Sequence, residues 1–465
     1  MNIKAKTPAH DLGSVAKRVL NADLHKEHQT SDWSQRPLTE EQIEYASADT
    51  EILFPLHKEL MLKAKAKNLK DVIDLEHAAL PAIVWMSTAG VTFNSEGWAK
   101  ELKSLSEDKE RAKWDLIETY SKLLGGSAAS EVNWNSPLQI KCAFKGVGIS
   151  LKDTKEATLK NVTHPLAKKL LQYKKLSKVI STYGEKLLDS VHNSRLYPNW
   201  KQIGAATGRM SCSSPNLQNF PPRVRKYVVA PEGKILIKAD YSQIELRIAA
   251  VVSQDNEMLD AFKNGVDIHE KTARSLTGQA TINKEARKLS KAVNFGLLYG
   301  QGANGLMNYA KNAYDIEMTL ADAEMYRKTF FKTYLGVARW HYNVKEAFGS
   351  GSRNAVTLTG RTRENMKSFN ELLNHPIQGS SADGLKASLT LLWKRRAECP
   401  SAFPVLVVHD EIVVECDIED EGTVTAWLKK AMIDGMEQVL QIGHSTSIVP
   451  VVVDVEPCRS WGDLS

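Results

Sequence analysis

Hydrophobic and polar positions along the chain predict three zones of different texture. Residues 1–72 predict helices joined by polar turns; in PLTEEQIEYASADTEILFPL, Thr39 is a candidate N-cap and Gln42 can complete a capping box. The next zone, 73 to about 200, is rich in lysine, and its run HPLAKKLLQYKKLSKVISTYGEKLLDSV places apolar residues at helical spacing. Beyond it, short apolar strands such as KILIKAD and FPVLVV lie among helices. The pattern therefore predicts a helical first part followed by mixed α and β structure.

Composition and charge narrow the class of protein. The 465 residues suggest roughly three domains at about 150 residues each. A net charge of +6 permits a polyanionic partner without requiring one. The five cysteines form no C-x-x-C pair, which argues against a disulfide framework or a zinc finger. No apolar run approaches the ~18–20 residues of a membrane span, and the N-terminus lacks the apolar stretch of a secretory signal. We therefore expect a cytoplasmic protein, neither secreted nor embedded in a membrane.

The segment KILIKADYSQIELRIAAVV carries the first candidate for chemistry. Ile235, Leu236 and Ile237 predict a short buried strand, Asp240 follows where that strand ends, and ELRIAAVV then turns helical. Turns and helix N-caps also favour Asp. This segment alone therefore leaves open both a capping role and a functional one.

The segment FPVLVVHDEIVVEC carries the second candidate. Its β-branched runs, 405–408 and 412–414, predict the arms of a tight hairpin, although the Asn-Gly or Asp-Gly pair that tight turns prefer is absent. Acids between buried strands lose hydration unless a cation or a hydrogen-bond donor meets them. If the strands of Asp240 and Asp410 share one sheet, their carboxylates can meet and bind Mg²⁺. Two-metal phosphoryl transfer requires such an arrangement.

The segment NKEARKLSKAVNFGLLYGQG carries the third candidate. Arg287, Lys291, Phe295 and Tyr299 recur every four residues, so on a helix they form one stripe, ~18 Å long at 1.5 Å per residue. Cations at one end suit phosphates, and rings at the other suit a nucleobase. An ordinary amphipathic helix would explain the rings, but not why both cations share their face. The spacing therefore favours a nucleoside triphosphate site.

Together these segments resemble the polymerase motifs of family A DNA polymerases, the DNA polymerase I group. The patterns D-Y-S-Q-I-E-L-R, R-x-x-x-K-x-x-x-F-x-x-x-Y-G and V-H-D-E occur in that order. The resemblance continues through TGRMSCSSPNLQNFP, DIHEKTA, LTGRTR and NHPIQGSSADG, and covers about 73 to 465. It implies an α+β right-hand polymerase fold, with an antiparallel palm sheet and helical fingers and thumb, preceded by a short helical exonuclease remnant.

The resemblance also divides the chain into domains. It implies a truncated 3′–5′ exonuclease-like segment at 1–72, and the thumb with the start of the palm at 73–225. The palm would carry its first metal aspartate in 226–262 and its second in 351–465, with the fingers between them at 263–350.

The implied activity is template-directed, primer-dependent DNA synthesis from dNTPs by two-metal nucleotidyl transfer, in replication or repair. Asp240 and Asp410, with the backbone carbonyl of Tyr241, would bind two Mg²⁺ ions, for which Mn²⁺ could substitute. The partners would be primer-template DNA and dNTPs, and the chain is expected to be a monomer.

The resemblance places a dNTP site on the predicted helix. Arg287 and Lys291 would grip the triphosphate, and Lys291 would also be a catalytic proton donor to pyrophosphate. Glu245 would be the steric gate against a ribose 2′-hydroxyl, and Phe295 would lie against the sugar and base. The remaining residues would be Gln243, His409 near the primer terminus, and Tyr299 in the templating position while the fingers are open.

A further set resembles residues that touch DNA. Purine N3 and pyrimidine O2 lie at the minor-groove edge of every correct pair, so a donor there checks shape without reading sequence. The Lys-rich stretch 168–178 resembles the thumb and would contact the phosphate backbone, unless it is only a solvated face. The residues that would touch the minor-groove edge are Arg209, Asn219, Asn374 and Gln378.

The first zone contains SDWSQRPLTEEQIEYASAD, which resembles the last motif of the family's 3′–5′ proofreading exonuclease. Tyr45 and Asp49 lie one helical turn apart, as a metal-bound nuclease would need. That exonuclease also requires a strand with Asp-x-Glu and a middle Asp, and a single carboxylate cannot hold two metals. We therefore expect a truncated piece that is inactive alone, either vestigial or completed by a separate exonuclease subunit.

Other interpretations stay open beside this one. Glu411 could be a supporting acid or a turn residue, and Asp267 and Asp383 could be helix-end or structural acids. A single-subunit RNA polymerase has a similar pair of aspartates and a similar cationic helix, but Glu245 should exclude ribonucleotides. A catalytically inactive DNA-binding scaffold would have no physical need for the complete set of acids and cations.

Overall fold

The computed structural model describes residues 10–24, 26–124, 132–442 and 449–463. The chain divides into two compact units, Met1–Asp74 and Leu75–Ser465. No helix among the described residues has both the length and the apolar content needed to cross a bilayer. All five cysteines are free, and four of them are buried.

The first unit is helical throughout its described residues. It contains α1 (Leu12–Leu20), α2 (Glu40–Glu51) and α3 (Leu53–Ala66), and α4 (Lys70–Ala89) begins in it. The predicted capping box at the start of α2 is confirmed: the Thr39 hydroxyl accepts from the Gln42 backbone N–H at 3.3 Å, and the Gln42 side chain accepts from the Thr39 backbone N–H at 3.0 Å.

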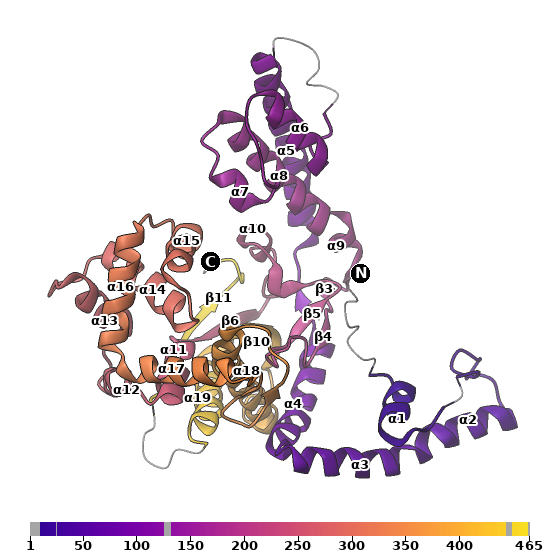
Figure 1. The fold of residues 1–465 in the computed structure, drawn as a ribbon. Coiled ribbons are helices and arrows are strands. Elements are labelled where there is room, and N and C mark those ends of the chain that lie inside the picture. The colour runs from indigo at the N-terminus through magenta and orange to yellow at the C-terminus, as the bar shows by residue number, and fades with distance from the viewer. Residues whose placement is uncertain (1–9, 25, 125–131, 443–448, 464–465) are drawn as a thin grey trace. The chain divides into compact units, whose positions relative to one another are not determined.

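The second unit is built around a four-stranded antiparallel sheet, with strand order β11-β6-β10-β9 (Figure 1). The strands are β6 (Lys234–Tyr241), β9 (Phe403–Val408), β10 (Glu411–Asp417) and β11 (Val453–Cys458). The predicted strand before Asp240 and the predicted hairpin are therefore confirmed.

Both faces of this sheet are buried, which explains why its strands read as nearly continuous apolar runs. Ile237 and Val414 belong to one hydrophobic cluster, which includes residues of α18 (Phe369–Lys394) and α19 (Glu421–Leu440). Leu236 and Val413 point into a second cluster on the other face.

The segment after β6 is helical and packs on the first of these clusters. It begins with α11 (Ile244–Ser253), which follows the strand as the sequence predicted. The other helices of this group are α12 (Asn256–Lys263), α13 (Ile268–Thr277), α14 (Lys284–Leu298), α15 (Ala303–Tyr314), α16 (Leu320–Thr333) and α17 (Leu335–Gly349).

A separate helical group has its own core, in which Leu116, Phe144 and Leu166 are fully buried. The predicted Lys-rich helix is confirmed but ends at Tyr183, and Gly184 separates it from α9. The elements here are α5 (Ser95–Leu124), α6 (Pro137–Gly146), α7 (Glu156–Lys160), α8 (Pro165–Tyr183) and α9 (Glu185–Asp189).

Short elements connect these parts. They are β1 (Val91–Thr92), β2 (Val191–His192), β3 (Arg195–Leu196), β4 (Asn199–Lys201), β5 (Ser211–Ser213), α10 (Pro222–Arg225), β7 (Ala355–Val356) and β8 (Thr362–Arg363), with 3-10 turns at Leu217–Asn219, Arg396–Glu398 and Ile418–Asp420.

Candidate active site

Asp240 and Asp410 come from neighbouring strands. In the β6–β10 pair, Asp240 lies opposite Glu411, so Asp410 falls one residue beyond the register at the same end of the sheet. The backbone N–H of Tyr241 donates to the carbonyl of Asp410 at 3.4 Å. Residues 170 positions apart in sequence are thus held side by side by strand pairing.

Burial sets the electrostatics of this acid pair. Burial, then the carboxylates of Asp410 and Glu411, raise the pKa of Asp240 to about 7. Burial likewise raises the pKa of Asp410 to about 6. Within the described part of the chain, Oδ1 of Asp240 is buried without a hydrogen-bond partner. A buried carboxylate with an unused oxygen beside a second acid fits a divalent cation, which would offset both the lost hydration and the like-charge repulsion.

The groups around Asp240 and Asp410 limit which protein atoms could bind a cation together with these two acids. The phenol of Tyr241 is buried and bonded to Ser388 Oγ at 2.7 Å and to the carbonyl of Met432 at 2.8 Å, so only the backbone carbonyl of Tyr241 is left to bind a cation. Among the described residues, no group of three or more His, Cys, Asp or Glu is arranged to hold a metal ion. The donor set therefore fits a hard cation that takes its other ligands from water and substrate oxygens, as Mg²⁺ does.

Two more acids flank Asp240. Glu411 accepts from Trp461 Nε1 at 2.7 Å and pairs with Lys238 at 3.5 Å, so both of its oxygens are engaged by the protein, in line with a supporting role. Asp454, on β11, is the cross-strand partner of Asp240 on the other side and is exposed. Sequence reasoning missed Asp454, although an apolar run followed by Asp is the same signal that marked Asp240.

The β9–β10 turn consists of His409 and Asp410, and it forms without glycine because His409 takes a left-handed conformation, with φ of 56°. A non-glycine residue in that region is strained, and such strain collects at functional sites. The turn holds His409 exposed at the edge of the acid pair.

Helix α14 carries the predicted stripe. Arg287, Lys291, Phe295 and Tyr299 are each half-buried, whereas most of the residues between the last three of them are buried. Tyr299 is the C-cap residue rather than part of the helix. Side chains four residues apart on a helix lie on nearly the same face, so these four side chains share one side of α14.

The two cations of the stripe differ in their partners. Arg287 pairs with Asp267 at 2.6 Å, and Asp267 also caps α13 by accepting from the backbone N–H of His269 at 2.7 Å. Within the described residues, Lys291 makes no ion pair. Phe295 packs against the ring of His269, with centroids 5.9 Å apart.

A second cluster joins four elements. Arg209 pairs with Glu245 of α11 at 2.6 Å, and the phenol of Tyr299 donates to the other oxygen of Glu245. Gln378 of α18 lies near the same phenol, and Asn370 donates to the carbonyl of Tyr299. The structure thus brings the predicted gate and templating-position residues together with two of the four predicted minor-groove residues, Arg209 and Gln378.

The remaining predicted residues are less closely joined to this cluster. Asn374 lies one turn before Gln378 on α18 and is half-buried. Gln243 is the N-cap residue of α11, with φ of 57°. Asn219 accepts a hydrogen bond at its backbone carbonyl from Tyr183 at 2.6 Å.

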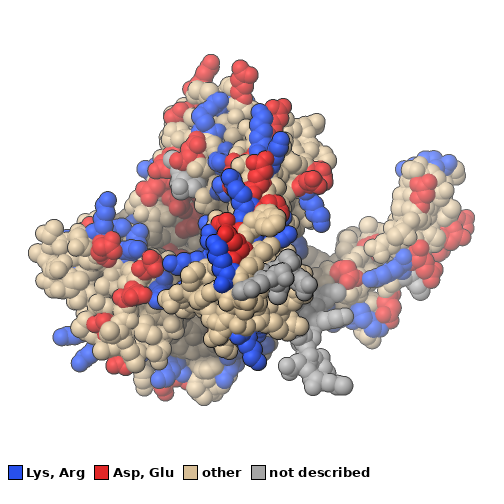
Figure 2. Space-filling view, turned by 90° about the horizontal axis from the view of Figure 1, so that it is seen from above, with Lys and Arg blue, Asp and Glu red and all other residues tan. Residues whose placement is uncertain are grey.

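Charged side chains of both signs are mixed on the face of the molecule seen in Figure 2. Figure 2 shows Lys and Arg interspersed with Asp and Glu over the visible face. On α8, Lys168, Lys175 and Lys178 are exposed, whereas Lys169 pairs with Asp115 at 2.6 Å.

A cationic groove of about 930 Å³ adjoins the residues after Tyr299. It lies among α16, α17, the Gly300–Gly302 turn and the start of α18, and no acid lines it. Its cations are Arg327, Lys328, Lys332 and Lys345, and its rings include Phe331, Tyr342, Phe348 and Phe369.

In the first unit, Tyr45 and Asp49 lie one turn apart on α2, as predicted. Tyr45 packs against the rings of Trp33 and His28, with centroids 6.0 Å and 6.3 Å away.

This sheet with its paired acids, flanked by two helical groups, defines a right-hand polymerase with palm, fingers and thumb. The POL domain of Pol1 from M. smegmatis, solved in complex with DNA primer-template and dNTP, has the same fold: the TM-score is 0.80 at 24% identity, over 98% of this chain and 79% of that one. The model of DNA polymerase family A matches residues 99–463, and the model of the 3′-5′ exonuclease matches residues 1–65.

Among curated relatives, DNA polymerase I of Aquifex aeolicus is 35% identical over 450 residues, which is 91% of this chain and 77% of the relative. DNA polymerase I of Treponema pallidum is 30% identical over 91% of this chain, and the chain spans 43% of its length. The thermostable DNA polymerase I of Thermus aquaticus is 33% identical over 64% of this chain, which spans 36% of it. The chain belongs to DNA polymerase family A, and its enzyme class is DNA-directed DNA polymerase.

Proposed function

We propose that this chain extends a DNA primer on a DNA template by nucleotidyl transfer from dNTPs, with two divalent cations at Asp240 and Asp410. The observation that carries the proposal is the pair of adjacent, half-buried acids, in which Oδ1 of Asp240 is buried and has no hydrogen-bond partner among the described residues. Mg²⁺, or Mn²⁺ in its place, would supply charge neutralisation and make the primer 3′-hydroxyl easier to deprotonate. The role of the protein is to hold the two carboxylates at one end of a rigid sheet.

The cationic stripe of α14 would bind the triphosphate of the incoming nucleotide. Lys291 has no competing ion pair within the described residues, so it can meet phosphate oxygens directly and protonate the departing pyrophosphate. Arg287 must exchange Asp267 for phosphate. Phe295 would then lie against the sugar and base of the same nucleotide.

Glu245 would select deoxyribose over ribose in the incoming nucleotide. Its carboxylate is held from two sides, by Arg209 and by Tyr299, so it forms a fixed wall rather than a mobile side chain. A fixed wall can exclude a 2′-hydroxyl by shape. We assign Gln243 and His409, which flank this wall and the acid turn, to the same nucleotide and primer site.

DNA would lie against both helical groups. Arg209, Asn219, Asn374 and Gln378 are proposed to face the minor-groove edge of the new pair. The exposed lysines of α8 would contact duplex phosphates. The groove beside Gly300–Gly302 would take the unpaired template, since a groove lined by cations and aromatic rings suits single strands.

The domain limits follow the same proposal. Residues 73–225 would form the thumb and the start of the palm, 263–350 the fingers, and 226–262 with 351–465 the palm. The limit at 262 falls inside the last turn of α12. We expect the chain to act as a monomer.

The exonuclease-like unit is proposed to be inactive in this polypeptide. The Asp-x-Glu of residues 1–72, Asp49-Thr50-Glu51, lies on helix α2, and the described residues of the unit include no strand that could carry such a pair. Mismatched primer incubated with the protein and Mg²⁺ should stay at full length. Trimming without another subunit would overturn this part.

The test of the main proposal is primer extension by the wild type and by Asp410→Asn. The wild type should extend with dNTPs and only with a divalent cation. The variant should lose extension by on the order of a hundredfold or more, the scale of one electrostatic group in a reaction centre, while duplex binding persists. Extension by the variant at the wild-type rate would refute the assignment.

A further inference from the structure

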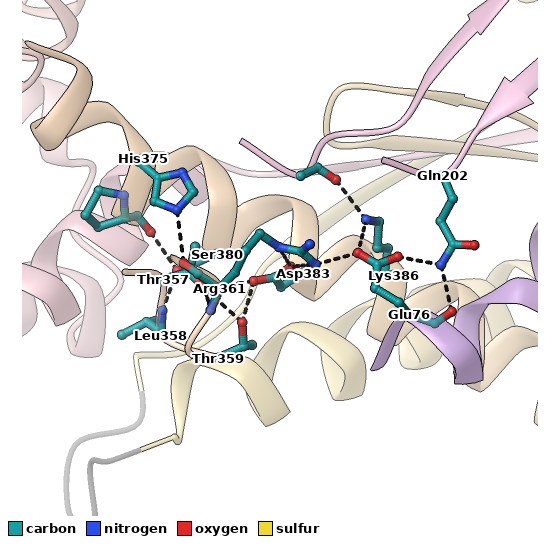
Figure 3. A network of polar contacts seen from close by, with 12 residues as sticks. Glu76, Gln202, Thr357, Leu358, Thr359, Arg361, His375, Ser380, Asp383 and Lys386 are labelled. Atoms are coloured by element: carbon teal, nitrogen blue, oxygen red, sulfur yellow. Dashed lines mark hydrogen bonds and ion pairs between the residues drawn. The ribbon is translucent and has the colours of Figure 1, made fainter. Parts of the chain in front are cut away.

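Four charged side chains form a buried network that joins α4, α18 and Arg361 (Figure 3). Arg361 binds Asp383 through Nε at 2.9 Å and Nη2 at 2.6 Å, and also binds Glu76 of α4. Lys386 of α18 binds the same oxygen of Glu76. Gln202 donates to both the side chain and the backbone carbonyl of Glu76.

The network is almost fully removed from water. Lys386 and Asp383 are 0% exposed, Glu76 is 8% and Arg361 is 9% exposed. Two cations balance two acids, and Thr357 and Thr359 donate to the remaining oxygen of Asp383. Because a buried ion pair stabilises a fold no better than well-packed apolar residues of the same volume, burial alone gives no reason for four charges here.

The network leads to one backbone position, Gly208. Lys386 Nζ donates to the carbonyl of Gly208 at 2.8 Å. Gly208 has φ of +91°, and a Cβ added there would lie 2.7 Å from Nε of Arg361. Lys386 and Arg361 therefore both contact Gly208, Lys386 through a hydrogen bond and Arg361 through close packing.

The next residue is Arg209. Its carbonyl accepts from the backbone N–H of Gly204 at 3.0 Å and of Ala205 at 3.1 Å, which closes the 204–209 loop. Its side chain reaches Glu245 at 2.6 Å. The ionic network therefore contacts the loop at Gly208, directly before the residue whose side chain reaches Glu245.

We propose that Lys386 and Arg361, held by Glu76 and Asp383, are positioning residues that fix Arg209 and so make extension sensitive to mismatched primer ends. This rests on the proposed function, in which Arg209 faces the new pair. Hydrogen bonds weaken steeply when donor and acceptor are misaligned. If the backbone of Arg209 is fixed, its guanidinium can therefore form a good hydrogen bond only to a base pair of correct shape. On a loosened loop the guanidinium could follow a displaced pair, and selectivity would fall.

The experiment compares matched and mismatched primer ends in Lys386→Met, in the charge-balanced Glu76→Gln/Lys386→Met, and in Gly208→Ala. The last variant keeps all four charges and disturbs the loop from its own side. The ratio of mismatched to matched kcat/KM should rise about tenfold in each, the change expected from one charged hydrogen bond. The matched control is Arg363→Met/Glu371→Gln, an ion pair at 3.2 Å that joins β8 to α18 and makes no bond to the 204–209 loop.

A double-mutant cycle separates positioning from folding. In an Arg209→Ala background, Lys386→Met should cause no further change in the ratio, although it can still lower the melting temperature. A lower melting temperature with an unchanged ratio in all three variants would overturn the proposal, as would a full additional effect in the Arg209→Ala background. If wild-type protein fails to extend matched primers, the proposed function itself is wrong.

Discussion

Arg287 binds Asp267 through two hydrogen bonds to one carboxylate oxygen, from Nη2 at 2.6 Å and from Nε at 3.2 Å. The same carboxyl group caps α13 through its other oxygen, so it ties two helices together at the end of the predicted triphosphate stripe. A nucleotide that needs Arg287 has to compete with this pair.

Asp267→Asn should therefore improve nucleotide binding. Asn caps a helix as well as Asp does, so α13 should keep its stability, while Arg287 loses a charged competitor. We expect KM for dNTP to fall about threefold with little change in kcat, the scale of one partly exposed ion pair. Steady-state single-nucleotide addition measures both constants. Glu270→Gln, which removes an acid paired with Arg274 on the same helix, is the control; a raised KM in Asp267→Asn would contradict the prediction.

Glu245→Ala should admit ribonucleotides. Removing the side chain opens the space beside the sugar, and the ratio of ribonucleotide to deoxyribonucleotide kcat/KM should rise by about ten- to a hundredfold. Deoxyribonucleotide addition should also slow, because Arg209 and Tyr299 lose their shared partner. Glu245→Gln keeps the volume and should keep most of the selectivity. Equal ratios in the wild type and Glu245→Ala would rule out the gate.

Two buried histidines should make the second unit sensitive to acid. Burial lowers the pKa of His341 and of His269 to about 4, below the ordinary value of 6.5. Each is held neutral in the folded state, so its contribution to stability is complete above pH 6.5 and is lost as pH falls toward 4. At pH 5 the loss is about 2 kcal/mol per histidine.

Thermal unfolding between pH 8 and pH 5 tests this expectation. The melting temperature should fall toward pH 5, and the fall should be smaller in His341→Gln, whose amide can keep a bond to the carbonyl of Leu298. Exposed His57→Gln on α3 is the matched control and should follow the wild type. A pH dependence that is the same in both variants would contradict the account.

The groove beside Gly300–Gly302 should bind unpaired template. Changing Lys328 and Lys332 together to Gln should weaken binding to primer-templates with a long 5′ overhang more than to blunt duplexes. The slope of log affinity against log salt should drop by about 0.7 for each lost phosphate contact on a single strand. Changing Lys63 and Lys65 of α3 to Gln removes the same charge elsewhere. An equal loss on blunt duplexes would place the contact on paired DNA instead.

Local signals in the sequence predicted the elements well where local physics decides them. The strand predicted from the apolar run 235–237, the two arms beside His409 and the capping box at Thr39 each formed as expected. The stripe on α14 was predictable because side chains four residues apart must share a helix face.

Such local signals could not predict contacts between residues that are far apart in the sequence. Glu76 meets Lys386 across 310 positions, and nothing near either residue indicates a partner. Asp267 was predicted as a helix-end acid, and it is one, but its bond to Arg287 depends on how α13 packs on α14. The left-handed conformation of His409 could not be predicted for another reason. The pairing of β9 with β10 overrides the local preference for glycine in such a turn.

The order of strands in the central sheet has a consequence for synthesis on the ribosome. β6 lies between β10 and β11, and the indole of Trp461 reaches back to Glu411 at the start of β10. Asp240 is therefore translated more than two hundred residues before its last neighbouring strand emerges. A nascent chain that stalls before β11 would leave Asp240 without one of its two flanking strands, so prematurely terminated products should not extend primers.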